Sequence, residues 1–329
     1  MSQPIIRTEG LGKTYRVARH HRGMLGTFRN LVSREYREVC AVSDVTFAIA
    51  AGEMVGYVGP NGAGKSTTIK MLTGILVPSQ GQVEVLGMVP HRRRKEVARH
   101  IGVVFGQRTQ LWWDLPLVES FDLLRHIYRV PSERFEANLA RFRELLELDR
   151  FLSTPVRQLS LGQRMRGELA AALLHEPGVL FLDEPTIGLD VVAKHRIRDF
   201  LRRVNREAGL TVLLTTHDMS DIEQLCQRLM IIDRGKLLYD GSLEQIRERF
   251  GTERTLVVDL AEDGLPPLEA PPAREVRADG PRRWLRFQRA EISAADLIAT
   301  VAARYRIEDL TIEEPEIETI IRRIYEEGL

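Results

Sequence analysis

Short apolar runs alternate with longer helical patterns along residues 1–250. The runs are rich in Val, Ile and Leu, which is typical of strands buried on both faces of a sheet. They lie at 53–58, 101–105, 179–183, 211–215 and 229–233. Between them, apolar residues recur every three or four positions, which predicts helices at 67–72, 117–129, 133–148 and 193–207. We therefore expect an α/β core with a largely parallel sheet.

Further strands at 4–17, 40–49, 83–86 and 236–239 and a helix near 243–250 complete the predicted core. The last part of the chain has a different pattern. In 251–329, four prolines mark a loop or hinge, and we expect strands at 254–260, 283–288 and 306–312 and helices at 293–304 and 316–326. About 80 residues is enough for a small α+β domain. The predicted domains are therefore 1–250 and 251–329.

Residues 18–38 form a basic insertion. Arginines outnumber acids, and apolar residues stand among them at helical spacing, at Met24, Leu25, Phe28, Leu31 and Val32. Such a segment can lie on anionic lipid headgroups or on a partner's loop. It can also pack its apolar stripe on the protein and leave its arginines in solvent. We favour the second interpretation, because most amphipathic surface helices pack on their own core.

Composition narrows the class of protein. The chain has 329 residues, of which 43% are hydrophobic and 28% charged, as in ordinary globular proteins. The net charge of +1 gives no sign of a nucleic-acid partner, and the basic run 92–95 has no interleaved aromatic residues. Cys40 and Cys226 fit a reducing compartment without a disulfide framework. No apolar run approaches the ~18 residues that span a membrane, so service to a membrane would require a separate spanning chain.

Residues 59–67 carry the clearest chemical motif. The stretch GPNGAGKST matches the phosphate-loop pattern G-x-x-x-x-G-K-[ST], between a predicted strand and a predicted helix. Glycines allow backbone N–H groups to approach phosphate oxygens, and the helix N-terminus adds partial positive charge. We expect Lys65 to reach the β- and γ-phosphates of a nucleotide and the Ser66 hydroxyl to ligate Mg²⁺.

Polar residues follow two of the predicted strands. The carboxyl ends of parallel strands meet at one edge of a sheet, where such folds bind ligands. Asp183 there fits the Walker B acid that holds Mg²⁺, and Glu184 can orient an attacking water, a role typically worth ~10²–10⁴ in rate. His217 follows the strand at 211–215 and is either structural or a contact of the γ-phosphate; its position leaves both open.

Trp112 and Trp113 are adjacent in the sequence. Two neighbouring large aromatic residues do not easily enter one core. Either one of them faces a cleft or a partner, or both pack inside a helical lobe.

Six motifs occur in an order that resembles the nucleotide-binding subunit of an ABC transporter. They are 59–67, Gln107, Leu159–Gln163, Asp183–Glu184, Gly188–Asp190 and His217. The resemblance covers roughly residues 4–250. It implies a P-loop NTPase core of the ABC ATPase type, with an antiparallel β subdomain and a helical subdomain at about 108–170. It also implies an ATPase with ATP and Mg²⁺ as cofactors.

The resemblance implies roles residue by residue. Tyr15 would stack on adenine, and Gln107 would touch Mg²⁺ and link the site to a transmembrane partner. The implied nucleotide-binding residues are Tyr15, Gly59, Pro60, Asn61, Gly62, Ala63, Gly64, Lys65, Ser66, Thr67, Ser160, Leu161, Gly162 and Gln163. The implied catalytic residues are Glu184, His217, Lys65 and Gln107, and the implied metal ligands are Ser66, Gln107 and Asp183.

The segment Leu159–Gln163 resembles the family signature, which is usually written LSGGQ. In this family the signature binds ATP held by another subunit, so the resemblance implies a homodimer or heterodimer of nucleotide-binding domains. Asp190 would lie at the dimer interface. Leu161 replaces the first glycine of the motif. Ser160 and Gly162 are kept, so we expect activity to survive.

One nucleotide-binding domain followed by a C-terminal part of this size resembles the ATPase subunits of daunorubicin-type and viologen-type multidrug exporters. The segment 310–315 before a short final helix is similar as well. This implies a peripheral protein on the cytoplasmic face of a bacterial cell membrane, bound to a separate transmembrane permease. An importer subunit would share every motif. A soluble ABC ATPase usually carries two nucleotide-binding domains or a long coiled coil, and neither is evident here.

Overall fold

The computed structural model describes residues 3–18, 36–106, 108–251 and 253–327. Most of the basic insertion 18–38, together with Gln107, lies outside the described residues. The chain divides into two compact units, residues 1–240 and residues 241–329. The expected boundary after residue 250 differs from this division, because the helix at 243–250 contacts the last helix of the chain.

A six-stranded sheet forms the centre of unit 1, with the strand order β5-β6-β7-β3-β8-β9. Its members are β3 (Met54–Val58), β5 (Ile101–Phe105), β6 (Val179–Asp183), β7 (Thr211–Thr215), β8 (Arg228–Asp233) and β9 (Lys236–Ser242). The pairings from β5 through β8 are parallel. All of β7 is buried, as its apolar run predicts. The expectation of a largely parallel sheet is confirmed.

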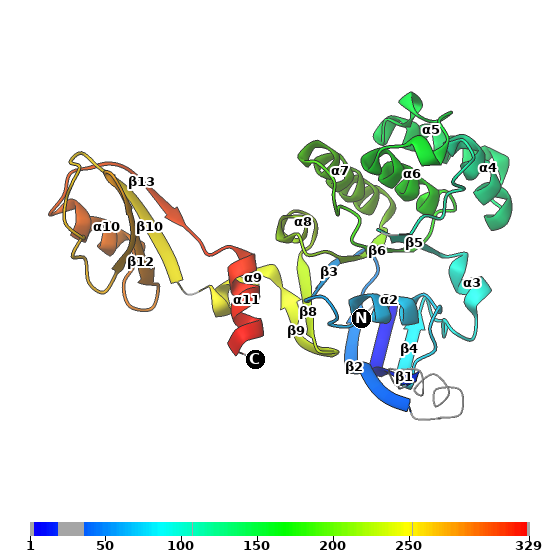
Figure 1. Cartoon of the computed structure of the whole chain (residues 1–329), viewed down its shortest axis with the longest axis horizontal. Coiled ribbons are helices and arrows are strands. Elements are labelled where there is room, and N and C mark those ends of the chain that lie inside the picture. The colour runs from blue at the N-terminus through cyan, green and yellow to red at the C-terminus, as the bar shows by residue number, and fades with distance from the viewer. Residues whose placement is uncertain (1–2, 19–35, 107, 252, 328–329) are drawn as a thin grey trace, which may run out of the picture. The chain divides into compact units, whose positions relative to one another are not determined.

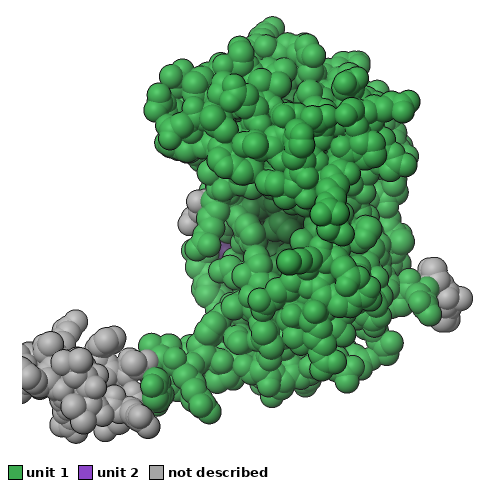
Figure 2. All heavy atoms as spheres, turned by 90° about the vertical axis from the view of Figure 1, so that its right-hand side faces the viewer, with its two compact units in different colours: residues 1–240 green, residues 241–329 purple. Residues whose placement is uncertain are grey.

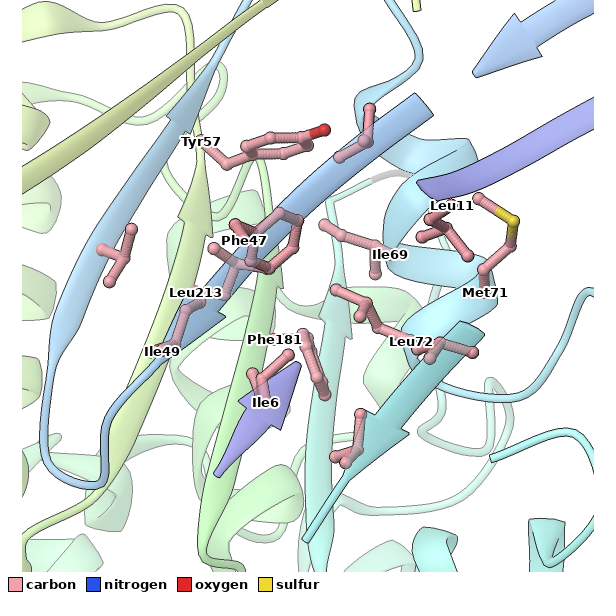
Figure 3. Packing of buried hydrophobic residues seen from close by; sticks show 14 of the residues in the cluster. Ile6, Leu11, Phe47, Ile49, Tyr57, Ile69, Met71, Leu72, Phe181 and Leu213 are labelled. Carbon is pink, nitrogen blue, oxygen red and sulfur yellow. The ribbon is translucent and has the colours of Figure 1, made fainter. Parts of the chain in front are cut away.

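A second sheet of unit 1 is antiparallel. It has the order β2-β1-β4 and consists of β1 (Ile6–Ala18), β2 (Tyr36–Ile49) and β4 (Gln80–Val85). Helix α2 (Lys65–Leu72) joins the core between the sheets through Ile69, Met71 and Leu72. Figure 3 shows these side chains beside Phe47 of β2 and Phe181 of β6. This core holds the helix that follows the phosphate loop against both sheets.

The helices after β5 form the third part of unit 1. They are α4 (Leu117–Tyr128), α5 (Ser132–Leu145) and α6 (Leu161–Leu173), with short 3₁₀ turns at Leu148–Arg150 and Val156–Gln158. Figure 1 shows α4, α5 and α6 together at one end of unit 1 and β1, β2 and β4 at the other. Figure 2 shows a face of unit 1 that is hollowed between its upper and lower parts. The predicted helical and antiparallel subdomains are therefore present.

The other helices in the described part of unit 1 are α3 (Arg94–Ala98), α7 (Val191–Ala208) and α8 (Met219–Leu225). Helix α7 follows β6, and α8 follows β7, so each begins near the carboxyl edge of the central sheet. None of the helices in the described parts of the chain has the length and apolar character needed to cross a membrane.

Unit 2 contains an antiparallel sheet with the order β11-β12-β10-β13. Its elements are α9 (Leu243–Phe250), β10 (Glu253–Leu260), β11 (Arg274–Asp279), β12 (Arg282–Gln288), α10 (Ala294–Ala302), β13 (Ile307–Glu313) and α11 (Ile317–Glu327). Leu297 and Val301 of α10 pack against Leu256 and Leu285 of the sheet. The small α+β fold is as predicted, but the edge strand β11 was not.

Candidate nucleotide site

The phosphate loop joins β3 to α2 and passes very close to neighbouring backbone. A Cβ atom on Gly59 would lie 2.3 Å from the carbonyl oxygen of Ile232. Gly64 has φ 111°, and a Cβ there would lie 2.6 Å from the carbonyl oxygen of Ala41. Only glycine fits both positions without displacing backbone. The two glycines therefore allow the loop to pass this close to the neighbouring backbone.

Lys65 is held over the loop that precedes it. Its Nζ donates to the carbonyl oxygens of Gly59, at 2.6 Å, and Pro60, at 3.1 Å. Burial lowers the pKa of Lys65, and the negative charges of Glu184 and Asp183 oppose that shift. The ammonium group thus lies between the loop and the two acids.

Asp183 is fixed by hydrogen bonds to both of its carboxylate oxygens. Ser66 Oγ donates to Oδ2 at 2.9 Å, and Thr215 Oγ1 donates to Oδ1 at 2.6 Å. The oxygens of Ser66 and Asp183 are thereby adjacent, and such hard oxygen ligands suit Mg²⁺. The described residues include no cluster of three or more His, Cys, Asp or Glu side chains that could enclose a metal.

Glu184 directly follows β6, and its φ of 56° lies in the left-handed region. Its N–H donates to the carbonyl oxygen of Thr215 at 2.9 Å, which continues the sheet ladder by one residue. Its side chain is half-buried, and Oε2 lies 3.5 Å from Nδ1 of the exposed His217. A carboxylate and an imidazole therefore meet at the edge of the sheet.

A cavity of ≈ 880 Å³ lies against the start of the phosphate loop, Ser66, Asp183, Glu184 and His217, whereas Lys65 is not among its lining residues. It is lined by Gly59, Pro60, Asn61, Ser66, Lys70, Ile75, Phe105, Gly106, Arg108, Asp183, Glu184, Ile187 and His217. Tyr15 on β1 and the segment 160–163 are not among its lining residues. The cavity thus unites the phosphate loop with the ends of β6 and β7, while the signature segment lies outside it.

The signature segment begins α6. Ser160 Oγ accepts a hydrogen bond from the N–H of Gln163, and the Gln163 side chain accepts one from the N–H of Ser160. This capping box satisfies backbone donors at the helix start. A Cβ atom on Gly188 would lie 3.1 Å from Cδ2 of Leu161. The side chain that replaces the usual glycine therefore uses space that Gly188 leaves open.

Asp190 begins α7, where its Oδ1 accepts a hydrogen bond from the N–H of Ala193 at 2.8 Å. The next two residues, Val191 and Val192, are apolar and exposed. Trp112 and Trp113 are also at the surface, with 37% and 49% of each exposed. Neither tryptophan is packed inside the helical part, so the alternative that both pack there is wrong.

Several residues at the cavity were not identified from the sequence. Thr215 orients Asp183, and the sequence signal for it is a polar residue at the end of an apolar strand. Arg108 lines the cavity, and its sequence context gives no sign of this. Gln107, which was identified, lies outside the described residues.

Comparison with known proteins gives the family. A family profile described as ABC transporter matches residues 42–187. The ABC transporter ATP-binding protein NatA of Bacillus subtilis (strain 168) is 33% identical over 210 residues, which are 64% of this chain and 85% of that protein. The chain belongs to the ABC transporter family of ATP-binding proteins. As the ATP-binding subunit of a transporter, it is an ATPase, and ABC ATPases bind ATP, generally with Mg²⁺.

Two other ABC proteins extend the comparison. The Nod factor export ATP-binding protein I of Ralstonia nicotianae is 35% identical over 251 residues, covering 75% of this chain and 77% of that protein. A dimeric ATP-binding cassette in a post-hydrolysis state with ADP and phosphate aligns with a TM-score of 0.60 and 27% identity. That alignment covers 72% of this chain and 98% of the cassette. The ABC ATPase fold is therefore shared with a hydrolysing dimer.

Proposed function

We propose that this protein is the ATP-hydrolysing subunit of an ABC exporter. The observation that carries the proposal is a cavity that Gly59, Pro60, Asn61 and Ser66 of the phosphate loop line together with Asp183, Glu184 and His217. In the proposal, the loop N–H groups and Lys65 bind the phosphates of ATP. Glu184 orients and deprotonates the water that attacks the γ-phosphate, and His217 contacts that phosphate.

The proposal includes Mg²⁺ as a cofactor. Ser66 and Asp183 would hold it, because their oxygens are adjacent and already aligned by a hydrogen bond. Gln107, outside the described residues, is the third proposed ligand. When bound, Mg²⁺ neutralises charge on the phosphate oxygens.

Two copies of the nucleotide-binding domain would enclose ATP between them. The start of α6 is a helix N-terminus with an exposed Ser160, which suits phosphate, but it lies outside this subunit's cavity. We therefore assign Ser160, Leu161, Gly162 and Gln163 to the ATP held by the other subunit, with Asp190 at the interface and Tyr15 at adenine. ATP that binds the closed dimer better shifts the population toward closure, and hydrolysis reverses the shift.

Export is the finer part of the proposal. The relatives include proteins named for Nod factor export and a probable multidrug transporter of Escherichia coli, of which the match covers 37%. We propose a daunorubicin- or viologen-type exporter, with the subunit on the cytoplasmic face of a bacterial membrane. A separate permease would dock near Gln107 and the exposed Trp112 and Trp113. A requirement for an external substrate-binding protein would instead indicate an importer.

The first test is the variant Glu184→Gln in an assay of Mg²⁺-dependent ATP hydrolysis. Loss of the general base should lower turnover by ~10²–10⁴, while ATP binding, which relies on the phosphate loop, remains. The exposed Glu136→Gln on α5 is the matched control and should hydrolyse ATP normally. Hydrolysis by Glu184→Gln at the rate of the unmodified protein would refute the proposal.

The same assay tests the shared site when protein concentration is varied. If each site needs two subunits, the rate per subunit should rise with concentration until the dimer saturates. A constant rate would be compatible with the proposal only if sizing shows a dimer at every concentration. A monomer that hydrolyses ATP at a constant rate would exclude the shared site.

A further inference from the structure

A buried polar network lies behind the proposed catalytic groups. Its centre is Asp221 on α8, which has 0% of its surface exposed. Oδ2 of Asp221 accepts hydrogen bonds from the hydroxyls of Thr186 and Thr216, the latter at 3.4 Å. Oδ1 accepts from Nε of Arg198 at 2.6 Å. One carboxylate therefore binds three side chains from three different segments.

The two threonines stand next to the residues that the proposed function uses. Thr186 follows Glu184 by two positions, and Thr216 directly precedes His217. Glu184 and His217 both lie beyond the ends of their strands, and the ladder continues past β6 by one hydrogen bond, from the N–H of Glu184 to Thr215. Because both hydroxyls bind the same oxygen of Asp221, this oxygen links the two segments beyond the paired ends of β6 and β7.

The network also reaches α7, the helix that follows Asp190. Arg198 lies on α7, and its Nη2 is also 2.5 Å from Oδ1 of Asp221. One turn earlier, Nζ of Lys194 donates to Oδ2 of Asp218 at 2.6 Å. The N–H of Asp218 in turn donates to Oγ1 of Thr216 at 3.0 Å. The segment at His217 is thereby tied to the first two turns of α7.

We propose that Asp221 is a positioning residue that holds Glu184 and His217 at the separation needed for ATP hydrolysis, an inference that rests on the proposed roles of those two residues. A buried carboxylate is stable only where charge and hydrogen bonds compensate its lost hydration. Here Arg198 supplies the charge, and the two threonines supply hydroxyl donors to the other oxygen. Such a fully paired network has a single low-energy arrangement, so it fixes the segments attached to it.

The test replaces the threonines and leaves the ion pair intact. Thr186→Val keeps the branched shape but removes the hydroxyl donor to Asp221. We expect kcat for ATP to fall roughly tenfold, because small misplacement of reacting groups is costly. KM for ATP and nucleotide binding should stay unchanged, since the phosphate loop is untouched. Thr186→Ser, which keeps the hydroxyl, should recover most of kcat.

Thr73→Val is the matched control. Thr73 is also buried, but its hydroxyl donates to Ile69 within its own helix. This variant should keep kcat and KM. Thr216→Val provides an independent reading through the second hydroxyl on the same oxygen, and it too should lower kcat at constant KM. If Thr186→Val does not fold, the kcat and KM of Thr216→Val test the positioning role of Asp221.

Glu184→Gln is assayed beside these variants, so that two kinds of failure are separated. If Glu184→Gln keeps normal hydrolysis, the proposed function itself is wrong. If Glu184→Gln is inactive but the folded threonine variants keep normal kcat, the positioning role of Asp221 is overturned. A parallel loss of kcat and ATP affinity in those variants would also overturn it, because it would indicate a general structural role.

Discussion

At the scale of single residues, the contact between Ser66 and Asp183 connects two segments that are far apart in sequence. The hydroxyl of Ser66 donates to Asp183 at 2.9 Å, and Thr215 holds the other carboxylate oxygen. The pair of oxygens is thus oriented by the protein before any metal binds. Preorganised ligands of this kind lower the cost of binding a cation.

Removing one of these oxygens should therefore weaken the use of Mg²⁺. For Ser66→Ala we expect the Mg²⁺ concentration that gives half-maximal hydrolysis to rise by roughly tenfold or more. The exposed Ser153→Ala should leave the Mg²⁺ dependence unchanged. A Mg²⁺ titration of ATPase activity measures both. Identical titration curves for Ser66→Ala and the unmodified protein would contradict the assignment.

Most of the residues that line the cavity could be predicted, because motif spacing identifies them. The phosphate loop has a fixed pattern, and acids after an apolar strand must lie at the carboxyl edge of a parallel sheet. The network around Asp221 could not be predicted. Asp221 looks like an ordinary helix acid in the sequence, and its partners Thr186 and Arg198 are distant along the chain. The packing of α8 against α7 brings Arg198 to Asp221, and periodicity does not encode this packing.

At the scale of elements, His175 links the helical part of unit 1 to the central sheet. Its ring stacks on Tyr128 at the end of α4, with centroids 3.9 Å apart. Its Nε2 lies 3.0 Å from the carbonyl oxygen of Ile101, the first residue of β5. Burial lowers the pKa of His175 from its ordinary 6.5 to about 4.

This pKa predicts how stability changes with pH. Between pH 6.5 and about 4, the unfolded chain binds a proton at His175 that the folded protein does not bind. The contribution of the neutral His175 ring to the free energy of unfolding is therefore fully present above pH 6.5. It declines as pH falls toward 4, by at most about 3 kcal/mol. Urea unfolding at a series of pH values should show a shallower decline for His175→Gln. The exposed His126→Gln should follow the unmodified protein, and an equal decline in all three would contradict the prediction.

The succession of strands and helices could be read from the sequence, but their arrangement could not. Apolar runs fix where β3, β6, β7 and β8 lie, since buried strands have little choice of composition. Strand β11 was missed because it is an edge strand in which charged residues replace the apolar pattern. The order β5-β6-β7-β3-β8-β9 depends on pairing between distant segments, which periodicity does not encode.

At the scale of the whole molecule, the chain consists of two units that each have a hydrophobic core of their own. The phosphate loop and all residues of the cavity belong to unit 1. A ligand that binds only a folded unit stabilises that unit. Binding of ATP should therefore have different effects on the two units.

Calorimetry of Glu184→Gln should show this difference without turnover. We expect two unfolding transitions, of which one rises with Mg²⁺ and ATP while the other stays constant. At a nucleotide concentration of about 100 times Kd, binding adds about 2.7 kcal/mol. That corresponds to a shift of roughly 5–10 °C for a unit of this size. A single transition would show that the units unfold together, and equal shifts of two transitions would show that nucleotide binding stabilises both units; either result would contradict the prediction.

The left-handed backbone at Glu184 has a consequence for how this protein can evolve. Gln is as unbranched as Glu, and Asn and Asp adopt this conformation more readily than most residues, whereas Val, Ile and Thr do so only with strain. A descendant could thus exchange the carboxylate, fold normally and still bind nucleotide. With Glu184 in its proposed role, loss of catalysis and loss of structure would be separable at this position. A single substitution at this position could therefore convert a subunit that hydrolyses ATP into one that responds to ATP binding without hydrolysing it.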